Sequence, residues 1–307
     1  MIKSITVFTP SYNRAHLLPR LYESLCRQSC QDFLWLVVDD GSSDGTDELV
    51  KKWQAENRIP IEYHFKENGG MHTGHNMAIK NIKTELCMCV DSDDYLNDDN
   101  IELILNLVDQ CKVLENENLA GIIGLNETPN GKIIGNPFPE DFLTSKYQDI
   151  AYINKATGDK KIVFKSKNLK ELDAYPTFPP EKFVPLYHPV LLDAKYDYLC
   201  FNKVFCVVEY QDDGSTINIY NQYFKNPKGF RYSRKIEMLN YKNTSRKFKS
   251  AIHQVSSNLV LKEINLIRES PNILLSTFAI PFGIVLYLYT LSKRNTKRNI
   301  NRYIIEK

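Results

Sequence analysis

The pattern in the sequence that most clearly indicates a chemical function is a pair of carboxylates separated by one residue. Asp91-Ser92-Asp93 directly follows the apolar run Leu86 to Val90. Hard divalent cations prefer such oxygens, and Mg²⁺ or Mn²⁺ usually completes its shell with water and substrate phosphates. A metal held here would stabilise the charge on a departing diphosphate. By itself the segment also suits a solvated turn that caps the next helix. Its place directly after a buried strand favours the interpretation as a functional site.

A second acidic pair, Asp39-Asp40, follows the apolar run Leu34 to Val38 in the same way. One of these carboxylates is expected to accept a hydrogen bond from the N–H group of a nucleotide base. Gly41 then lets the chain turn. The same residues also suit a helix N-cap, so at least one of Asp39, Ser43 and Asp44 is expected to serve the turn only.

A glycine-rich segment from Glu67 to Asn76 opens a predicted helix. It contains neither GxxxxGK[ST] nor GxGxxG, and therefore matches neither a P-loop nor a dinucleotide-binding turn. Backbone N–H groups at the start of that helix are instead placed to face an anion or a ribose. His72 and His75 lack a third ligand at helical spacing, so we do not expect zinc.

Alternating strands and helices must position these segments. Runs rich in apolar and β-branched residues predict strands at 2–9, 33–38, 61–65 and 86–90, with helices between them. Parallel neighbours need a crossover, so the alternation predicts an α/β fold with a mainly parallel, Rossmann-like sheet flanked by helices. Ligands bind at the carboxyl ends of such strands, and we expect the polar segments to converge on one crevice. Residues 120–125 and 198–209 predict further strands.

The composition is that of a folded protein with ordinary charge. Of 307 residues, 43% are hydrophobic. The sequence has 39 Lys and Arg residues and 37 Asp and Glu residues, and this near balance excludes the strongly basic surface typical of nucleic-acid binding. Seven cysteines without a CxxC pair predict reduced, mostly buried thiols and a cytoplasmic protein. The apolar run at 2–8 lacks the features of a signal peptide and predicts a first strand.

Four segments, taken in order, resemble the inverting glycosyltransferase family 2, whose fold is called GT-A. They are Thr9-Pro10-Ser11-Tyr12-Asn13-Arg14, the run Val37 to Thr46, Asn68-Gly69-Gly70 with Asn76, and Asp91-Ser92-Asp93-Asp94. The likeness spans about residues 2–125.

The resemblance implies a role for each matched residue. Thr9 and Tyr12 would surround the nucleoside, and Asp40 would bind the base, expected to be uracil. Asp91 would contact the ribose, and Asp93 would hold the Mn²⁺ or Mg²⁺ that bridges two phosphates. The implied donor site of a nucleotide-diphosphate sugar also includes Arg14, Asp39, Gly70, Asn76 and Ser92.

The catalytic base is the point at which the sequence departs from the pattern. Glu181-Lys182-Phe183-Val184-Pro185 resembles a bacterial subgroup in which Phe-Val-Pro is followed by Glu, but Leu186 stands there instead. An inverting enzyme needs a carboxylate to take the acceptor's proton. Glu181 is the expected substitute, with a plain surface role as the alternative and His188 as a further candidate. A chain without a base would be a nucleotide-sugar-binding subunit.

The Gln-x-x-Arg-Trp motif of processive synthases in this family is absent from the sequence, which implies transfer of one sugar per encounter. We expect a GT-A domain at 1–235, with a nucleotide-sugar half at 1–127 and an acceptor half at 128–235. A helical extension follows at 236–307. Five basic residues either hold a phosphate or form a solvated helix face: Lys225, Lys228, Arg231, Arg234 and Lys235.

An apolar run near the C-terminus predicts contact with a membrane. Residues 273–292 would form a helix of about 28 Å, near the thickness of one hydrocarbon core, although Pro281 and Gly283 are expected to break it. A basic stretch follows, with Lys293, Arg294, Lys297, Arg298 and Arg302. This pattern favours peripheral attachment to the inner face of the cell membrane, beside a lipid-linked or saccharide acceptor of cell-surface polysaccharide synthesis. A full span and a buried helix are the alternatives.

Overall fold

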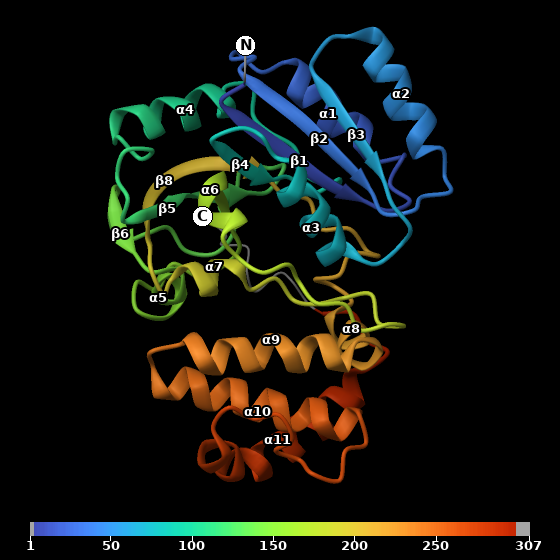
Figure 1. Cartoon of the computed structure of the whole chain (residues 1–307), viewed down its shortest axis with the longest axis vertical. Helices are drawn as coiled ribbons and strands as arrows, with labels where there is room; N and C mark the ends of the chain where they lie inside the picture. The colour runs from blue at the N-terminus through green and yellow to red at the C-terminus, as the bar shows by residue number, and fades with distance from the viewer. Residues whose placement is uncertain (1–2, 299–307) are drawn as a thin grey trace. The chain divides into compact units, whose positions relative to one another are not determined.

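The computed structural model of the chain describes residues 3–298, which divide into two compact units (Figure 1). The first unit runs through Ala174 and takes in Lys195–Glu209. The second consists of Tyr175–Ala194 and the described residues from Tyr210 onward. Compactness therefore groups residues 210–235 with the C-terminal helices. The functional boundaries expected after residues 127 and 235 stay predictions.

The first unit is built on one eight-stranded sheet in the order β3-β2-β1-β4-β7-β5-β8-β6. Strands β3, β2, β1 and β4 are mutually parallel, as the alternating pattern predicted. β7 runs antiparallel to β4 and β5, and β6 runs antiparallel to β8, so the second half of the sheet is mixed. The strands are β1 (Ile5–Ser11), β2 (Phe33–Asp39), β3 (Ile61–Phe65), β4 (Leu86–Cys89), β5 (Leu119–Glu127), β6 (Leu143–Ser145), β7 (Lys160–Lys165) and β8 (Asp197–Val207).

Helices flank this sheet and complete the expected α/β fold. They are α1 (Leu18–Cys26), α2 (Thr46–Glu56), α3 (Met71–Asn81), α4 (Asn100–Gln110), α5 (Tyr147–Tyr152) and α6 (Ser166–Lys170). The core between α1, α2 and the sheet contains three stacked aromatic rings, with Tyr22 and Trp53 centroids 4.3 Å apart and Trp35 beside both. Such large buried rings stabilise the packing of the helices that carry them. All seven cysteines are free thiols.

The second unit is helical. Its helices are α7 (His188–Leu192), α8 (Ile219–Lys225), α9 (Pro227–Asn240), α10 (Thr244–Val260) and α11 (Ile273–Lys293). A small core of Met238, Ala251, Val255 and Ala279 joins α9, α10 and α11. Gly283 allows α11 to approach α10 closely, because a methyl group there would lie 2.4 Å from Val255 Cγ1.

The predicted break at Pro281 and Gly283 is wrong, since α11 is one continuous helix through Pro281. Packing against α10 outweighs the backbone hydrogen bond that the proline removes, because most helix stability in proteins comes from tertiary contacts.

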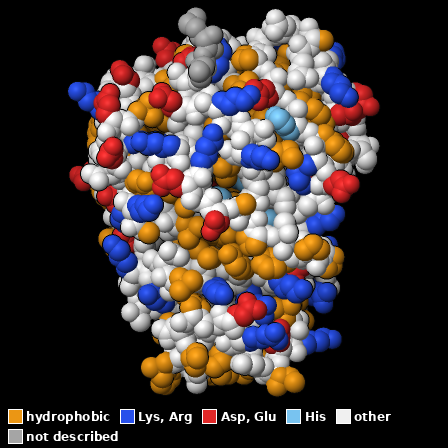
Figure 2. All heavy atoms as spheres, in the orientation of Figure 1, with side chains coloured by type: hydrophobic (Ala, Val, Ile, Leu, Met, Phe, Trp, Pro, Cys, Tyr) orange, Lys and Arg blue, Asp and Glu red, His pale blue; other side chains and the backbone are white. Residues whose placement is uncertain are grey.

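Most of α11 faces outward. It is long and apolar enough to cross a membrane, with a mean hydropathy of 1.9, and only 22% of its most apolar window is buried. Figure 2 shows hydrophobic side chains gathered on the surface over this helix. They include Leu274, Phe278, Phe282, Val285 and Leu288. The alternative of a buried helix therefore does not hold for α11, whereas Arg302 of the basic stretch lies outside the described residues.

Candidate active site

The polar segments after β1, β2 and β4 meet at one edge of the sheet. β1 lies between the other two strands, and all three run parallel. The Asp40 N–H donates to the Ser11 carbonyl at 2.8 Å, and the Val90 N–H donates to the Phe8 carbonyl at 3.0 Å. Asp40 and Asp91 therefore flank the end of β1, about two strand spacings or roughly 10 Å apart. The segments therefore converge at this edge of the sheet, whereas a ligand-binding crevice there stays a prediction.

Asp40 holds the glycine-rich segment in place. Its two carboxylate oxygens accept the backbone N–H groups of Gly69 at 2.9 Å and Gly70 at 2.7 Å. Lys66, just after β3, forms a buried ion pair with the same carboxylate. Gly70 has a φ of +96°, a conformation that favours glycine, and it starts α3. A carboxylate at the end of β2 thus fixes the N-terminus of α3. Lys66 was not found from the sequence, although its place directly after a strand is a signal.

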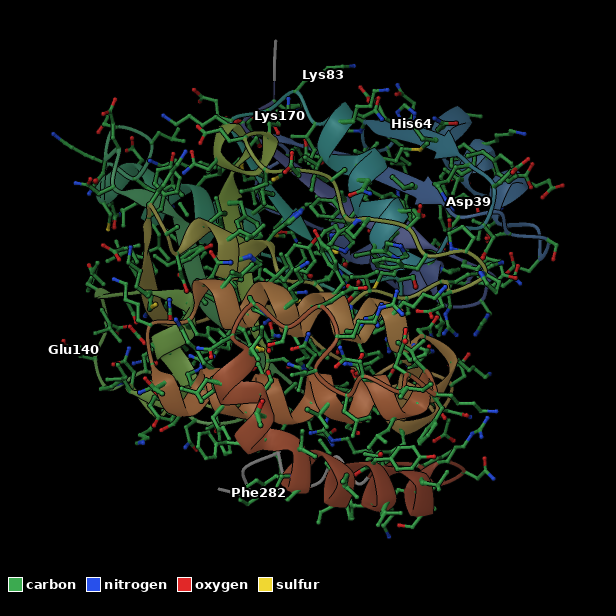
Figure 3. The ribbon with its side chains drawn as sticks, turned by 60° about the horizontal axis from the view of Figure 1, so that its bottom comes forward. Asp39, His64, Lys83, Glu140, Lys170 and Phe282 are labelled. Atoms are coloured by element: carbon green, nitrogen blue, oxygen red, sulfur yellow. The ribbon has the colours of Figure 1, made fainter. Side chains whose placement is uncertain are left out.

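Asp39 serves the turn after β2, and Figure 3 shows it at the end of that strand. One of its oxygens accepts the Ser42 N–H at 2.8 Å and the other accepts the Tyr63 hydroxyl at 2.7 Å. Burial and this hydrogen bond raise the pKa of Tyr63. Asp44 likewise accepts the Ala15 N–H at 2.8 Å, which joins this turn to the segment after β1. A contact between Asp39 and a nucleotide stays a prediction.

Thr9 and Tyr12 lie at the same edge of the sheet but differ in their exposure to solvent. The buried Thr9 hydroxyl donates to the Val90 carbonyl at 2.8 Å and accepts from Trp35 Nε1 at 3.0 Å. Thr9 therefore ties together the strands that carry the acidic segments. Tyr12 is 49% exposed, so its ring is open to stack on a base.

The carboxylates of the Asp91-Ser92-Asp93 segment repel each other. Burial and the neighbouring Asp91 raise the pKa of Asp93 to about 6, while Arg14 and Lys161 act in the opposite direction. Two carboxylates that repel each other in a partly buried place favour a divalent cation between them. Residues 3–298 contain no group of three or more His, Cys, Asp or Glu side chains fit to hold a metal. A pair of carboxylates suits a cation that draws its other ligands from water and phosphate, as Mg²⁺ and Mn²⁺ do.

Two cations that sequence reasoning missed hold this acidic segment. Arg20, on α1, donates to the backbone carbonyl of Asp93 and forms an ion pair with Glu209. Lys161, on β7, lies 3.5 Å from Asp94 Oδ2 and donates to the Cys89 carbonyl at 3.1 Å. Burial nevertheless raises the pKa of Asp94 to about 8. Since β7 was not predicted, nothing local in the sequence connected Lys161 with this place.

Two histidines of α3 lie buried behind the glycine-rich segment. Burial lowers the pKa of His72 and of His75 to about 4, so both are neutral at pH 7. Neither ring nitrogen of His72 has a hydrogen-bond partner within residues 3–298. Asn76 lies on the same helix, and its contact with a donor sugar stays a prediction.

Glu181 belongs to the second unit, where its carboxylate binds the start of α9. It accepts the backbone N–H groups of Lys228 at 3.1 Å and Gly229 at 3.0 Å. Such bonds satisfy N–H groups that have no partner within the helix. His188 is buried and stacks on Tyr175 with ring centroids 3.8 Å apart, and Leu186 is exposed. Glu181 as the base stays a prediction.

The five basic residues of α8 and α9 do not form one solvated face or one phosphate clamp. Arg231 is buried and pairs with Glu269 at 2.9 Å, while Arg234 pairs with Glu237 at 2.6 Å. Both guanidinium groups are therefore used inside the helical unit.

With this geometry in place, comparisons with known proteins show what part of the chain is similar to. Residues 6–115 match the family model described as Glycosyl transferase family 2. This segment, which carries all of the acidic strand ends, is therefore similar to glycosyltransferase family 2.

Two relatives illustrate the likeness. The chain is 31% identical over 140 residues to the chondroitin synthase of Pasteurella multocida (strain Pm70), which covers 45% of this chain and 14% of that protein. It is 26% identical over 183 residues to the poly(ribitol-phosphate) beta-N-acetylglucosaminyltransferase TarS of Staphylococcus aureus (strain Mu50), which covers 57% of this chain and 30% of that protein. The chain thus spans less than a third of the length of these curated relatives.

Solved structures share the fold. The crystal structure of S. aureus TarS superposes with a TM-score of 0.58 at 18% identity, over 94% of this chain and 55% of that one. The mannosyltransferase PcManGT of Pyrobaculum calidifontis, solved with GDP-Man and Mn²⁺, gives a TM-score of 0.55 at 14% identity, over 94% and 82% of the two chains. The GT-A-like fold expected from the sequence is confirmed.

Proposed function

We propose that this chain transfers a sugar from a nucleotide-diphosphate sugar, with UDP as the expected nucleotide, to a saccharide or lipid-linked acceptor of cell-surface polysaccharide synthesis. The proposed transfer is inverting and adds one sugar per encounter. The observation that carries the proposal is the meeting of Asp40, the glycine-rich segment and the Asp91–Asp93 pair at one sheet edge. The TarS structure in complex with UDP-GlcNAc, which has the same fold, supports a UDP-sugar donor.

Each part of the edge has a role in this proposal. Tyr12, half exposed, stacks on the base, and Asp40 keeps the glycine-rich segment in place through the backbone N–H groups of Gly69 and Gly70. Asp93 would hold a divalent cation, which would supply Lewis-acid stabilisation of the leaving diphosphate, and Asp91 would contact the ribose. Arg20 and Lys161 keep the acidic segment in position through its backbone.

The outward-facing apolar helix supports peripheral attachment to the inner face of the cell membrane. A helix with exposed Phe278, Phe282 and Leu288, followed by Lys293 and Arg294, suits the boundary between acyl chains and anionic headgroups. Attachment would hold the chain at the membrane that carries a lipid-linked acceptor.

The test is donor binding and turnover with Asp93→Asn. We expect UDP-GlcNAc to raise the thermal midpoint of the wild-type chain only when Mn²⁺ or Mg²⁺ is present, because a ligand of the native state stabilises it. Asp93→Asn should lose this shift and lose transfer by at least about 100-fold, the scale of removing one strong transition-state contact. Asp98→Asn, an exposed acidic residue nearby in sequence, is the matched control. Metal-independent turnover in Asp93→Asn would contradict the proposal.

A second candidate, a nucleotide-sugar-binding subunit without its own base, is favoured by one observation. Both oxygens of Glu181 already accept backbone N–H groups, and Leu186 stands where the related subgroup has Glu. Under this alternative the wild-type chain binds UDP-sugar and metal without turnover, and Glu181→Gln leaves binding unchanged. If Glu181 is the base, Glu181→Gln abolishes transfer while donor binding remains.

A further inference from the structure

The acidic segment between β4 and α4 is held by polar side chains of α1 and of the residues just after it. Arg20 and Ser24 lie on α1, and Gln28 follows the end of this helix, so the three residues recur at intervals of four. Residues four apart lie on one face of a helix. Arg20 donates to the Asp93 carbonyl, and the Leu96 N–H donates to the Ser24 hydroxyl at 3.2 Å. One face of α1 therefore contacts the backbone that carries the acidic pair.

Gln28 binds the chain on both sides of the start of α4. Its side-chain nitrogen donates to the Asn97 carbonyl at 2.7 Å, and its side-chain oxygen accepts the Ile101 N–H at 3.0 Å. The first N–H groups of a helix have no partner within that helix. Among the described residues, the N-cap residue Asp99 makes no capping bond with its own side chain. Gln28 thus supplies from another element the acceptor that an N-cap residue usually provides.

Both side chains are shielded from water and fixed in orientation. Ser24 is fully buried and Gln28 is 4% exposed. The Ser24 hydroxyl also donates to the Leu21 carbonyl at 2.8 Å, and the Gln28 side-chain nitrogen donates to the Ser24 carbonyl at 3.0 Å. Because water has little access, removal of these side chains leaves backbone groups of the acidic segment without a partner.

A fixed backbone matters here because the carboxylates of Asp91 and Asp93 repel each other. Two such groups remain within reach of one cation only if the chain that carries them is held by other contacts. Mg²⁺ in particular demands a near-ideal arrangement of oxygens. Groups that orient the ligands of a metal without touching it usually have a large effect on its affinity.

We propose that Ser24 and Gln28 are positioning residues, which fix the backbone after Asp93 so that its carboxylate is preorganised for a divalent cation. They act through the backbone of the segment, with Arg20 as the third contact on the same face of α1. This inference rests on the proposed function, because the metal-binding role of Asp93 is part of it. Its consequence is that the metal requirement depends on a helix far from the acidic pair in the sequence.

The test is a double variant, Ser24→Ala with Gln28→Met, in the full chain. It removes both contacts and keeps side chains of similar size in the core. Thr6→Val is a control of matched burial, since it removes a hydroxyl on β1 that lies 2.7 Å from the Thr84 hydroxyl. Calorimetry measures UDP binding over a series of Mn²⁺ concentrations. Hydrogen exchange of residues 91–101 without ligand, followed by mass spectrometry, and thermal melting complete the set.

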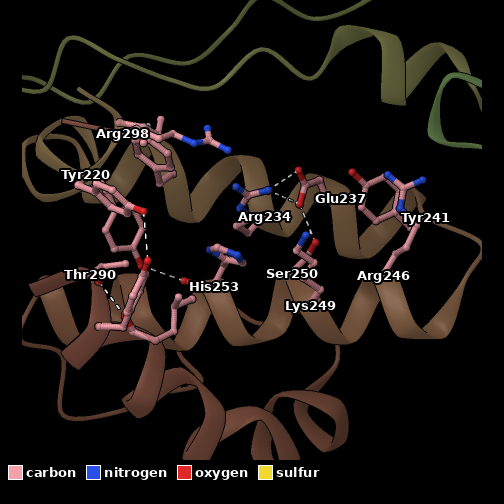
Figure 4. A pocket seen from close by; sticks show the side chains of 15 residues that line it. Tyr220, Arg234, Glu237, Tyr241, Arg246, Lys249, Ser250, His253, Thr290 and Arg298 are labelled. Carbon is pink, nitrogen blue, oxygen red and sulfur yellow. Dashed lines mark hydrogen bonds and ion pairs between the residues drawn. The ribbon is translucent and has the colours of Figure 1, made fainter. Parts of the chain in front are cut away.

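A second control repeats the serine substitution in the helical unit. Ser250 is buried, as Ser24 is, and its hydroxyl donates to Glu237 at 2.6 Å beside Arg234 (Figure 4). Ser250→Ala therefore makes the same chemical change in a place that does not contact the acidic segment. If the double variant does not fold, Gln28→Met alone is tested against the same two controls.

We expect the Mn²⁺ concentration for half-maximal UDP binding to rise about tenfold in the double variant, the lower end of the effect of such outer groups on metal affinity. Saturating Mn²⁺ should restore the wild-type level of UDP binding, because Asp91 and Asp93 are both still present. Hydrogen exchange of residues 91–101 should be about tenfold faster, as the loss of buried hydrogen bonds implies. Thr6→Val and Ser250→Ala should keep the wild-type Mn²⁺ requirement.

Three results would count against these roles, and they are distinguishable. An unchanged Mn²⁺ requirement in a double variant that melts earlier would show a purely structural role and overturn the proposal. An equal rise in Thr6→Val would trace the effect to general destabilisation and overturn it as well. Absence of UDP binding by the wild-type chain at every Mn²⁺ concentration would instead refute the proposed function, and the positioning role with it.

Discussion

Asp40→Asn should weaken the attachment of the glycine-rich segment and so lower the stability of the first unit. The Asp40 side chain is 4% exposed and its partner Lys66 is 16% exposed, so water screens the pair little. Asparagine keeps one oxygen that can accept a hydrogen bond. Its NH₂ group replaces the other oxygen and faces a backbone N–H donor that this oxygen accepts in the wild type. Leaving one partner of a buried pair uncompensated costs about 3–5 kcal/mol. We take about 3 kcal/mol, which lowers the thermal midpoint of a unit of this size by about 6–12 °C.

The assay is thermal and urea unfolding of wild type, Asp40→Asn, Lys66→Met and the double variant. Lys66→Met leaves Asp40 with its two backbone donors, so we expect a smaller loss of about 1–2 kcal/mol. The double variant also lacks the ammonium group that Asp40→Asn leaves uncompensated. Its loss of stability should therefore be about 1–3 kcal/mol smaller than the sum of the two single losses. Asp98→Asn, which breaks an exposed pair with Arg27, should change stability by less than about 1 kcal/mol. Additive effects, or an Asp40→Asn loss as small as that of Asp98→Asn, would refute the reasoning.

Four further predictions concern single residues. Because the raised pKa of Asp93 is about 6 and a metal needs the carboxylate, Mn²⁺-dependent UDP-GlcNAc affinity should fall about tenfold from pH 7 to pH 5, which titration calorimetry would show. Burial lowers the pKa of His72 from 6.5 to about 4. The contribution of neutral His72 to the free energy of unfolding is therefore complete above pH 6.5 and is lost as pH falls toward 4. In urea titrations, His72→Leu should reduce this acid-induced loss by about 1.4 kcal/mol per pH unit. Gly283→Ala should destabilise the helical unit by about 1–3 kcal/mol despite the better helix propensity of Ala, because the new methyl would meet Val255; a gain in melting temperature would contradict this packing. Glu181→Gln should lower the melting temperature slightly by weakening the start of α9, at a cost of about 1 kcal/mol, and an unchanged melting curve would show that these bonds contribute nothing.

The sequence by itself determined the half of the sheet that carries the candidate site. Short apolar runs separated by helical patterns identify parallel strands, and parallel strands present their carboxyl ends at one edge. The acidic residues after β2 and β4 therefore had to meet, and they do so on either side of β1. The apolar character of α11 was also readable from the sequence, whereas its continuity through Pro281 was not.

Only the tertiary structure decided which partners these residues have. Lys66 reaches Asp40 across 26 positions, Arg20 reaches the Asp93 carbonyl across 73, and Lys161 reaches Asp94 across 67. The antiparallel β7 and the helix contact of Glu181 likewise join segments distant in the sequence. Local propensity and periodicity fix which face a residue occupies along its own element, whereas these contacts depend on how separate elements pack, which no local pattern encodes.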